Sequence, residues 1–398
     1  MSPDTKIAVV GAGIAGLAVG IAAARQKCRV TLIDSAAARG DGSVLLLWPN
    51  GMKAAAALGL AEEIAGTGTT VRRTEFKLWN GAQLWELDVD SFEKKHGAAA
   101  VLISREHLVK VLKAALPATV PPLVQARCTG FTVFGEGVAP ILAASSVGGV
   151  HDGLIGCDGL RSTIRAQLRP HDECPRSAHH SAWIGLSDVT SGEWDYDVGH
   201  TVTFHGHGLR LCASTMKEPG DIAGTRRVYW YATEAVSELR KDGVVLTQRQ
   251  LVELFATVST GAAALIEKSL TNARLAPTRI PVEDRVPVRR WSWGRVTLAG
   301  DAAHPSTPDL GQGACQALES AAVLGRCLAG SDEVEKALRR FERLRLERTA
   351  RVTEMSRLTG IQSTTRGPLV EPLRELGIRA LLPTIAEKEF ESLFSVET

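Results

Sequence analysis

The sequence lacks several features that define specialised classes of protein. It has no internal repeat, no low-complexity segment and no block of Lys or Arg longer than a pair. Its 398 residues carry a formal net charge of only +2, so no nucleic acid is expected as a partner. Hydrophobic residues make up 44% and charged residues 23%, which are ordinary values for a globular protein. A chain of this length is expected to form two domains or one large composite.

Paired cysteines are also missing. The seven cysteines are odd in number and form no C-x-x-C motif, which argues against a disulfide framework or structural zinc and indicates a reducing cytoplasm. Cys157 and Cys315 lie in glycine-rich segments and are interpreted as tightly packed core residues rather than nucleophiles. No metal site is expected, because no carboxylate or ligand spacing supports one among His179, His180, His200, His205 and His207.

One stretch, Ile7–Ala24, has no charged residue over 18 positions. Its length would suit a membrane span or the core of a signal peptide. However, Gly11, Gly13 and Gly16 have the spacing G-x-G-x-x-G, which a phosphate-binding turn explains and a membrane span does not. We therefore expect no stable membrane insertion.

The same stretch predicts a βαβ unit, with a strand at Lys6–Val10, a helix at Ile14–Arg25 and a strand at Arg29–Asp34. The three glycines would permit a tight turn, approach of a pyrophosphate and close helix packing, and Ala15 belongs to the same loop. The helix N-terminus offers N–H groups to the anion, and Asp34 lies where a carboxylate binds ribose hydroxyls. A glycine-rich turn without a ligand is the alternative, and the motif does not separate FAD from NAD.

A second glycine-rich segment, Gly300–Gly313, follows a strand expected at Trp291–Ala299. A carboxylate at the end of that strand, Asp301, suits the ribityl chain of a flavin. The amides of Gly313 and Ala314 would then point at the N1–C2=O edge of the ring, which becomes negative on reduction. Taken alone, the segment is better explained by Asp301 as a helix cap and His304 as a packed loop residue.

The middle of the chain has a different composition. From about residue 176 to 285 it is richer in Trp, Tyr and β-branched residues. Hairpin turns are expected at Asn80-Gly81 and at Gly206-His207-Gly208, with a strand at Arg227–Ala232. These signals indicate an antiparallel sheet with helices, inserted into the nucleotide-binding fold. The charged segments Glu333–Leu358 and Pro372–Leu393 are expected to be helical.

Three separated segments together resemble a known family. They are the Gly11 loop, the run Asp158-Gly159-Leu160-Arg161-Ser162, and the run Gly300-Asp301-Ala302-Ala303-His304-Pro305. In this order they are similar to single-component FAD-dependent aromatic hydroxylases, the group A flavoprotein monooxygenases of the salicylate and 6-hydroxynicotinate hydroxylase type. Further matches are Trp48-Pro49-Asn50-Gly51-Met52-Lys53, Ser104-Arg105-Glu106-His107-Leu108, Asp284-Arg285 and Trp293-Gly294-Arg295-Val296.

The resemblance implies an α/β fold, in which a Rossmann-like FAD-binding domain has an inserted antiparallel-sheet substrate domain and a C-terminal helical cap. The expected boundaries are residues 1–70, 100–175 and 285–330 for the discontinuous FAD-binding domain, 71–99 and 176–284 for the substrate domain, and 331–398 for the helical region.

The resemblance also implies roles for single residues. Arg105 and Asp34 would bind the ribose and pyrophosphate half of FAD, Asp301 the ribityl chain, and Pro308 would lie beside flavin C4a. The Asp158 motif would act toward both FAD and NAD(P)H. Because no second G-x-G-x-x-G follows a strand, NAD(P)H is expected only as a transient co-substrate. The expected cofactor contacts are Gly11, Gly13, Ala15, Gly16, Asp34, Arg105, Asp158, Asp301, Gly311, Gly313 and Ala314.

Substrate-side candidates come from the middle sheet. Gly206-His207-Gly208-Leu209-Arg210 is similar to a G-x-G-x-R run in the family, and Tyr229 falls where an aromatic residue is frequent. Arg210 could anchor an anionic substrate or influence flavin reduction, Tyr229 could hydrogen-bond the substrate, and His205 could deprotonate it. The alternative is that Arg210 is a solvated strand residue and Tyr229 a core residue, since alternate strand residues face opposite sides.

The chain departs from the family in three places. It has Gly40-Asp41-Gly42-Ser43 where a glycine-alanine-glycine run is common before Trp48. Cys315 occupies a position often taken by Asn, and Asp309 one that is usually apolar. These departures concern details of flavin contact and the polarity of the substrate loop rather than FAD binding itself.

The expected function is that of an NAD(P)H- and O2-dependent FAD monooxygenase that hydroxylates a small aromatic or N-heterocyclic molecule through a flavin C4a-hydroperoxide. The alternatives are an olefin epoxidase or oxidative decarboxylase of the same fold, a flavin halogenase, or a non-catalytic binding protein that has lost the flavin. Trp291-Ser292-Trp293 is similar to part of the halogenase motif, but Gly294-Arg295-Val296 follows instead of Ile-Pro. The protein is expected to be cytoplasmic and a monomer or homodimer.

Overall fold

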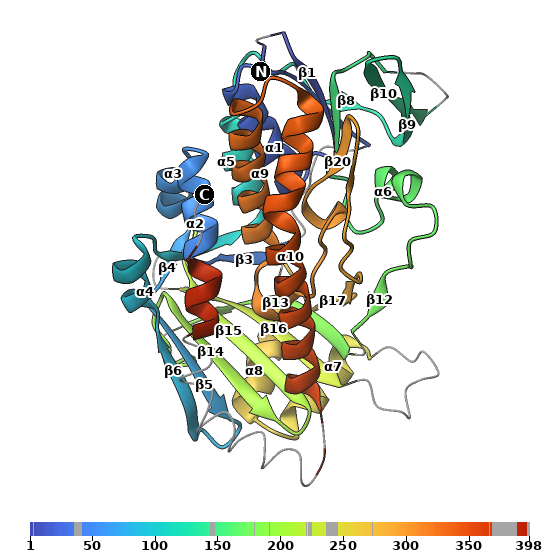
Figure 1. Ribbon diagram of the computed structural model, residues 1–398. Coiled ribbons are helices and arrows are strands. Elements are labelled where there is room, and N and C mark those ends of the chain that lie inside the picture. The colour runs from blue at the N-terminus through green and yellow to red at the C-terminus, as the bar shows by residue number, and fades with distance from the viewer. Residues whose placement is uncertain are drawn as a thin grey trace.

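The computed structural model describes residues 1–2, 4–35, 42–143, 148–178, 180–190, 192–219, 221, 225–235, 246–272, 274–365, 367 and 388–395. Two sheets dominate it. The smaller lies with its helices at one end of the molecule, and the larger lies at the other (Figure 1). A long C-terminal helix runs along one side and reaches both.

The first sheet has six strands in the order β19-β20-β11-β1-β2-β8. Its strands are β1 (Lys6–Val10), β2 (Arg29–Asp34), β8 (Val124–Gln125), β11 (Gly153–Gly156), β19 (Ser292–Trp293) and β20 (Val296–Leu298). All neighbouring pairs are parallel except β19 with β20. Apolar residues of β1 and β2 are almost completely buried, as expected for a parallel sheet covered by helices.

Helices cover this sheet because their small residues permit close packing. The helix α1 (Ile14–Arg25) follows β1 and packs on α5 (Arg105–Ala114) and α9 (Gly313–Ala329). The contact between α1 and α9 includes Gly325, where an added Cβ would lie 3.2 Å from the Cβ of Ala22. The long helix α10 (Val334–Thr364) then packs across α9.

The second sheet has seven strands in the order β17-β13-β16-β15-β14-β5-β6. They are β5 (Arg73–Leu78), β6 (Gln83–Asp88), β13 (His180–Val189), β14 (His200–Gly206), β15 (Leu209–Met216), β16 (Arg226–Ala235) and β17 (Thr278–Ile280). Every pair is antiparallel except β5 with β14, so the sheet is mixed. The helices α7 (Gln248–Ala256) and α8 (Thr260–Ser269) pack on one of its faces around Trp230 and Phe255.

Smaller elements connect the two sheets. The remaining helices are α2 (Pro49–Ala57), α3 (Ala61–Thr67), α4 (Val89–His96) and α6 (Thr163–Leu168), with 3-10 turns η3 (Gly300–Ala302) and η4 (Pro308–Leu310). The remaining strands are β3 (Val44–Leu47), β4 (Thr69–Val71), β7 (Ala100–Ser104), β9 (Cys128–Phe134), β10 (Gly137–Leu142), β12 (Arg176–Ser177) and β18 (Glu283–Asp284).

Several sequence predictions differ in detail from the structure. The single strand expected at Trp291–Ala299 is a hairpin, because Gly294 adopts φ +54° and reverses the chain between β19 and β20. The turn at Asn80-Gly81 is a four-residue loop between Leu78 and Gln83 rather than a two-residue turn.

The C-terminal region is helical where it is described. Most of Pro372–Leu393 lies outside the described residues, but residues 388–394 form a helical turn whose Phe390 and Phe394 pack against Trp48. The described part of the chain contains no helix with the length and apolar character needed to cross a bilayer.

Candidate functional site

The glycine loop forms a phosphate-type turn between β1 and α1. Gly11 has φ +103°, and an added Cβ would lie 2.3 Å from the carbonyl oxygen of Cys157. A Cβ on Gly16 would lie 1.8 Å from the carbonyl oxygen of Gly11, so this glycine lets the helix pack against the turn itself. In contrast, among the described residues no atom lies within 4 Å of a Cβ placed on Gly13. The middle glycine therefore faces open space.

The second glycine-rich segment is tied to the Asp158 motif. Arg165 is buried and donates from Nη1 to the carbonyl oxygens of Ala302 and Ala303 at 3.0 and 2.9 Å. The Asp158 carboxylate accepts from the backbone N–H of Thr163 at 2.7 Å, in the first turn of α6, whose N-cap is Ser162. The last Arg of this motif thus positions the loop that contains Asp301.

These segments enclose a cavity of about 540 Å³, within the size range of cofactor pockets. Most of the residues predicted to contact the cofactor line it; Gly16 and Gly311 do not. Gly16 lies beneath the turn instead, and Gly311 ends η4 with φ +62°. The predicted residues that line the cavity are Gly11, Gly13, Ala15, Asp34, Arg105, Asp158, Asp301, Gly313 and Ala314.

The cavity has the chemistry that an FAD molecule requires. Helices α1 and α9 both begin at it, and their first turns contain no acidic residue that would repel a phosphate or an electron-rich ring edge. Gly13 and Gly313 both have space where a side chain would otherwise stand. Asp301 is exposed to the cavity; desolvation by the surrounding protein raises the pKa of its carboxyl group, whereas Arg105 acts in the opposite direction. The residues present therefore fit a dinucleotide with a flavin at the α9 end.

The start of α9 is held from behind by a buried polar network. The Glu319 carboxylate accepts hydrogen bonds from Asn50 Nδ2 and from Arg345 Nη1, both at 2.6 Å. Asn50 Nδ2 also donates to Gln312 Oε1 at 2.8 Å. Burial would raise the pKa of Glu319, but Arg345 and Arg348 outweigh it and lower the pKa to about 2. The carboxylate is therefore ionised and fixes the residue that precedes Gly313.

Cys315, one turn into α9, is a packed core residue as the sequence analysis expects. It is fully buried, and an added Cβ on Gly51 would lie 2.7 Å from its Sγ. Burial raises the pKa of its thiol to about 12, so it stays protonated.

The register of the large sheet places the three substrate-side candidates on one face. Arg210 on β15 lies directly opposite His205 on β14, and Tyr229 on β16 lies opposite Ser214, four residues after Arg210 on β15. Paired residues share a face, so all three point away from α7 and α8 and toward the nucleotide-binding part. In agreement, Tyr229 packs against the core of that part.

A buried ion pair on this face joins the large sheet to the loop that contains Pro308. Arg210 Nη2 lies 2.5 Å from Asp309 Oδ1, and the Asp309 side chain has no exposed surface. His180 Nε2 lies 3.6 Å from the same oxygen, and the Arg210 guanidinium lies over the Tyr231 ring at 5.2 Å. Burial would raise the pKa of Asp309, but Arg210 and His180 lower it to about 2. The structure therefore excludes the solvated position considered for Arg210.

This cluster contains polar atoms without partners. Within the described part of the chain, Arg210 Nε, Tyr231 OH and Asp309 Oδ2 are buried and make no hydrogen bond. Leaving such groups unpaired costs about 1–3 kcal/mol each, so the arrangement suits a ligand that pairs with them. Helix α10 covers the cluster through Gly360, where a Cβ would lie 2.5 Å from Asp309 Oδ2.

Sequence reasoning missed several residues of both sites. Arg127 lines the cavity but belongs to no motif; it follows β8, whose pairing with β2 brings it near Asp34. In the sequence, Asp309 differs from the family only as a polar residue at a usually apolar position. Nothing in the sequence around His180 or Tyr231 indicates a role in a site. The pairings of β13 with β16 and of β15 with β16 bring these side chains to one place. His179 lies outside the described residues, and these residues contain no cluster of three metal-ligating side chains.

The fold and cavity define a class of protein, in which one Rossmann-type unit holds a dinucleotide cavity and a second sheet lies beside it. The chain belongs to the family described as FAD binding domain, whose sequence model matches residues 4–357. Because its relatives are monooxygenases by name, it is an FAD-dependent oxidoreductase of the monooxygenase type.

Two characterised relatives are similar over most of their length. Aurachin C monooxygenase/isomerase of Stigmatella aurantiaca is 32% identical over 351 residues, covering 87% of each chain. The 3-amino-4-hydroxybenzoate 2-monooxygenase of Streptomyces cremeus is 32% identical over 366 residues, covering 89% of this chain and 86% of the relative. In fold, the chain is similar to Klebsiella pneumoniae HpxO complexed with FAD and uric acid. The TM-score is 0.85 at 23% identity, covering 98% and 97% of the two chains.

Proposed function

We propose that the enzyme uses NAD(P)H and O2 to hydroxylate a small aromatic or N-heterocyclic ring that presents an N–H or O–H group beside a carbonyl or oxyanion. The observation that supports this most strongly is the buried cluster of Arg210, Asp309 and Tyr231 with its unpaired atoms. The Streptomyces cremeus relative acts, by its name, on 3-amino-4-hydroxybenzoate, which is a phenolic ring, and HpxO was solved with FAD and uric acid.

Bound FAD supplies the hydride acceptor and the oxygen-activating ring, and the chain supplies position and charge. Asp301, Arg105, Asp34 and the N-termini of α1 and α9 would hold it, with Pro308 beside the reactive part of the ring. We propose no permanent NAD(P)H site; the Asp158 motif would contact NAD(P)H only during reduction.

Asp309 is the proposed acceptor for the substrate N–H or O–H. Because its pKa is about 2, it is ionised throughout the neutral range and accepts a hydrogen bond without itself titrating there. A carboxylate at that position draws the substrate proton toward itself and raises the electron density of the ring, which favours attack on an electrophilic oxygen. Arg210 would bind the neighbouring substrate oxygen.

Tyr231 is suited to donate to the same oxygen, because burial and Asp309 raise its pKa well above the ordinary value and keep it protonated. Tyr229 and His205 lie on the same face and are proposed to line the substrate site. His205 stacks on Phe76 with ring centroids 6.1 Å apart, which favours a packing role over that of a base.

The test uses the substitution Asp309→Asn in FAD-loaded protein. We expect the variant to retain FAD and basal NAD(P)H oxidation, but to lose about tenfold to a hundredfold of the substrate-stimulated rate, as expected for a lost hydrogen bond to a charged group of about 1.5–3 kcal/mol. The measurement is NAD(P)H oxidation with a panel of hydroxybenzoates, aminohydroxybenzoates, quinolones and purines, together with hydrogen peroxide release.

The matched control is Asp197→Asn, which removes a highly exposed carboxylate that pairs with Arg226 on the same sheet. It is expected to behave as wild type. Full substrate stimulation in Asp309→Asn would contradict the assigned role, whereas wild-type protein that binds FAD and responds to no ring compound would contradict the function itself.

A further inference from the structure

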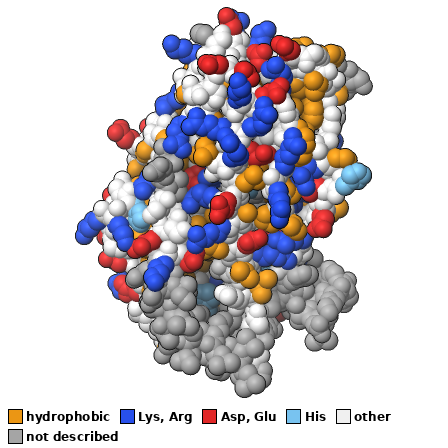
Figure 2. Space-filling view, viewed as in Figure 1, with side chains coloured by type: hydrophobic (Ala, Val, Ile, Leu, Met, Phe, Trp, Pro, Cys, Tyr) orange, Lys and Arg blue, Asp and Glu red, His pale blue; other side chains and the backbone are white. Residues whose placement is uncertain are grey.

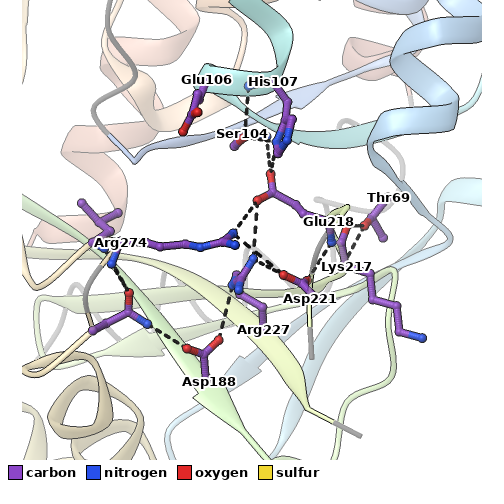
Figure 3. Close-up of polar contacts among 12 residues, drawn as sticks. Thr69, Ser104, Glu106, His107, Asp188, Lys217, Glu218, Asp221, Arg227 and Arg274 are labelled. Carbon is purple, nitrogen blue, oxygen red and sulfur yellow. Dashed lines mark hydrogen bonds and ion pairs between the residues drawn. The ribbon is translucent and has the colours of Figure 1, made fainter. Parts of the chain in front are cut away.

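A second buried carboxylate, Glu218, joins the large sheet to the nucleotide-binding part. It lies just after β15, and only 6% of its side chain is exposed. Its Oε1 accepts from the backbone N–H of Ser104 at 3.2 Å and lies 3.2 Å from Nδ1 of His107. Figure 3 shows Glu218 between these two residues on one side and Arg227 and Arg274 on the other.

The two residues that Glu218 contacts flank Arg105 at the start of α5. Ser104 is the N-cap of that helix, and its Oγ accepts from the backbone N–H of His107 at 3.3 Å. Arg105 itself donates its backbone N–H to Ser43 at 2.9 Å. Its side chain lines the FAD cavity, and its charge acts on Asp301. The path of residues 104–107 therefore determines where the Arg105 guanidinium lies.

Glu218 is itself held in place. Its backbone N–H donates to Asp221 Oδ2 at 2.8 Å, and its Oε2 lies 3.5 Å from both Arg227 Nη1 and Arg274 Nη1. Just before it, Lys217 and Thr69 exchange two hydrogen bonds of 2.8 and 2.9 Å, which link the same turn to β4.

Two physical effects favour this contact. A carboxylate at a helix N-terminus interacts favourably with the positive end of the helix dipole and satisfies a backbone donor. Because the carboxylate is buried, these charge-assisted bonds are less weakened by water than those of a surface pair. The two arginines balance the charge of Glu218 and Asp221, so the cluster needs no external ion.

We propose that Glu218 is a positioning residue for FAD binding: it fixes the first turn of α5 and thereby directs Arg105 toward the cofactor. This inference rests on the role proposed above for Arg105. It also means that cofactor affinity depends on the docking of the large sheet, since Glu218 lies in the turn that directly follows β15 and Arg105 belongs to the other part.

A double-mutant cycle on FAD affinity tests the inference without any substrate. The dissociation constant of FAD is measured by quenching of flavin fluorescence for wild type, Glu218→Ala, Glu218→Gln, Arg105→Ala and both double variants. We expect Glu218→Ala to weaken binding about tenfold and Glu218→Gln about threefold in the wild-type background. In the Arg105→Ala background each is expected to change binding by less than about twofold.

The control is Glu86→Gln, which neutralises another carboxylate of the large sheet, paired with Arg73 on an edge strand. It is expected to leave FAD affinity unchanged. Equal losses in both backgrounds, no loss in either, or no effect of Arg105→Ala would each overturn the proposal. If Glu218→Ala does not fold, the isosteric Glu218→Gln replaces it, and its effect on FAD affinity is compared between the wild-type and Arg105→Ala backgrounds. Failure here leaves the proposed hydroxylation untouched, because that depends on Asp309.

Discussion

His304 shows at the residue scale how the site constrains protonation. It is buried, and its Nε2 lies 2.9 Å from Ser320 Oγ. Burial and the nearby Arg345 lower its pKa to about 3 from the ordinary value of 6.5. The folded protein therefore keeps this imidazole neutral, while the unfolded chain takes up a proton below about pH 6.5.

Because of His304, the free energy of unfolding should decrease as the pH is lowered. Because the unfolded state binds the extra proton between pH 6.5 and 3, the free energy of unfolding should fall by about 2 kcal/mol from pH 7 to pH 5. In His304→Gln this part of the pH dependence should disappear, as measured by denaturant unfolding at both pH values. An exposed histidine variant, His171→Gln, should retain the wild-type pH dependence. Equal pH dependence in His304→Gln and wild type would refute the assignment.

Asp301 gives a second prediction at this scale. A hydrogen bond to a charged group contributes about 1.5–3 kcal/mol, so Asp301→Ala should weaken FAD binding by about tenfold to a hundredfold and yield pale protein. Equilibrium titration with FAD measures the loss. Full retention of FAD by the variant would show that another group binds the ribityl chain.

At the scale of elements, the first turn of α1 separates two uses of glycine. A Cβ on Gly13 meets no described atom within 4 Å, and its backbone is extended at φ −76° and ψ −168°. A Cβ on Gly16 would overlap the Gly11 carbonyl oxygen. The absence of a side chain at Gly13 therefore keeps space in the cavity, whereas its absence at Gly16 allows α1 to pack against the turn.

The substitutions Gly13→Val and Gly16→Val form a matched pair. Gly13→Val should keep the melting temperature of the FAD-free protein within a few degrees and weaken FAD binding at least about tenfold, because the side chain enters the cavity. Gly16→Val should lower the melting temperature strongly or prevent folding, because overpacking against backbone cannot be relieved. Thermal scans without FAD and titrations with FAD separate the two. A stable Gly16→Val variant would contradict this division.

Helix α10 shows how one element serves both halves of the molecule. Its exposed side is rich in Lys and Arg mixed with acidic residues, as part of the face in Figure 2 shows. Its buried side directs Arg345 to Glu319 behind the α9 N-terminus and places Gly360 over Asp309. The helix thus connects the support of the cofactor end to the cover of the polar cluster.

For the whole molecule, the sequence predicts best what depends on neighbours along the chain. The βαβ unit and most of α10 lie where the sequence predicts them, and the glycine motifs identify one cavity even though Gly13 and Gly313 are 300 positions apart. These predictions hold because local propensity and motif chemistry agree with the fold.

What the sequence could not predict depends on register and on long-range pairing. The pairing of β14 with β15 determines whether the Arg210 side chain faces the cofactor part or α8. A shift of this pairing by one residue would move the side chain to the opposite face of the sheet. Asp309 pairs with Arg210, on a strand about a hundred positions earlier, so the residue type of Asp309 alone could not predict this ion pair. The same holds for Glu218, whose partners come from four different segments of the chain.

The most direct test of the account is a crystal structure of the protein with bound FAD. The account predicts that the pyrophosphate lies at the N-terminus of α1 beside Gly13. The isoalloxazine ring should lie between Gly313 and Pro308, with its open side toward Arg210 and Asp309. A ring placed on the opposite side of the cavity, away from Arg210 and Asp309, would contradict the central claim that these two residues hold the substrate at the flavin.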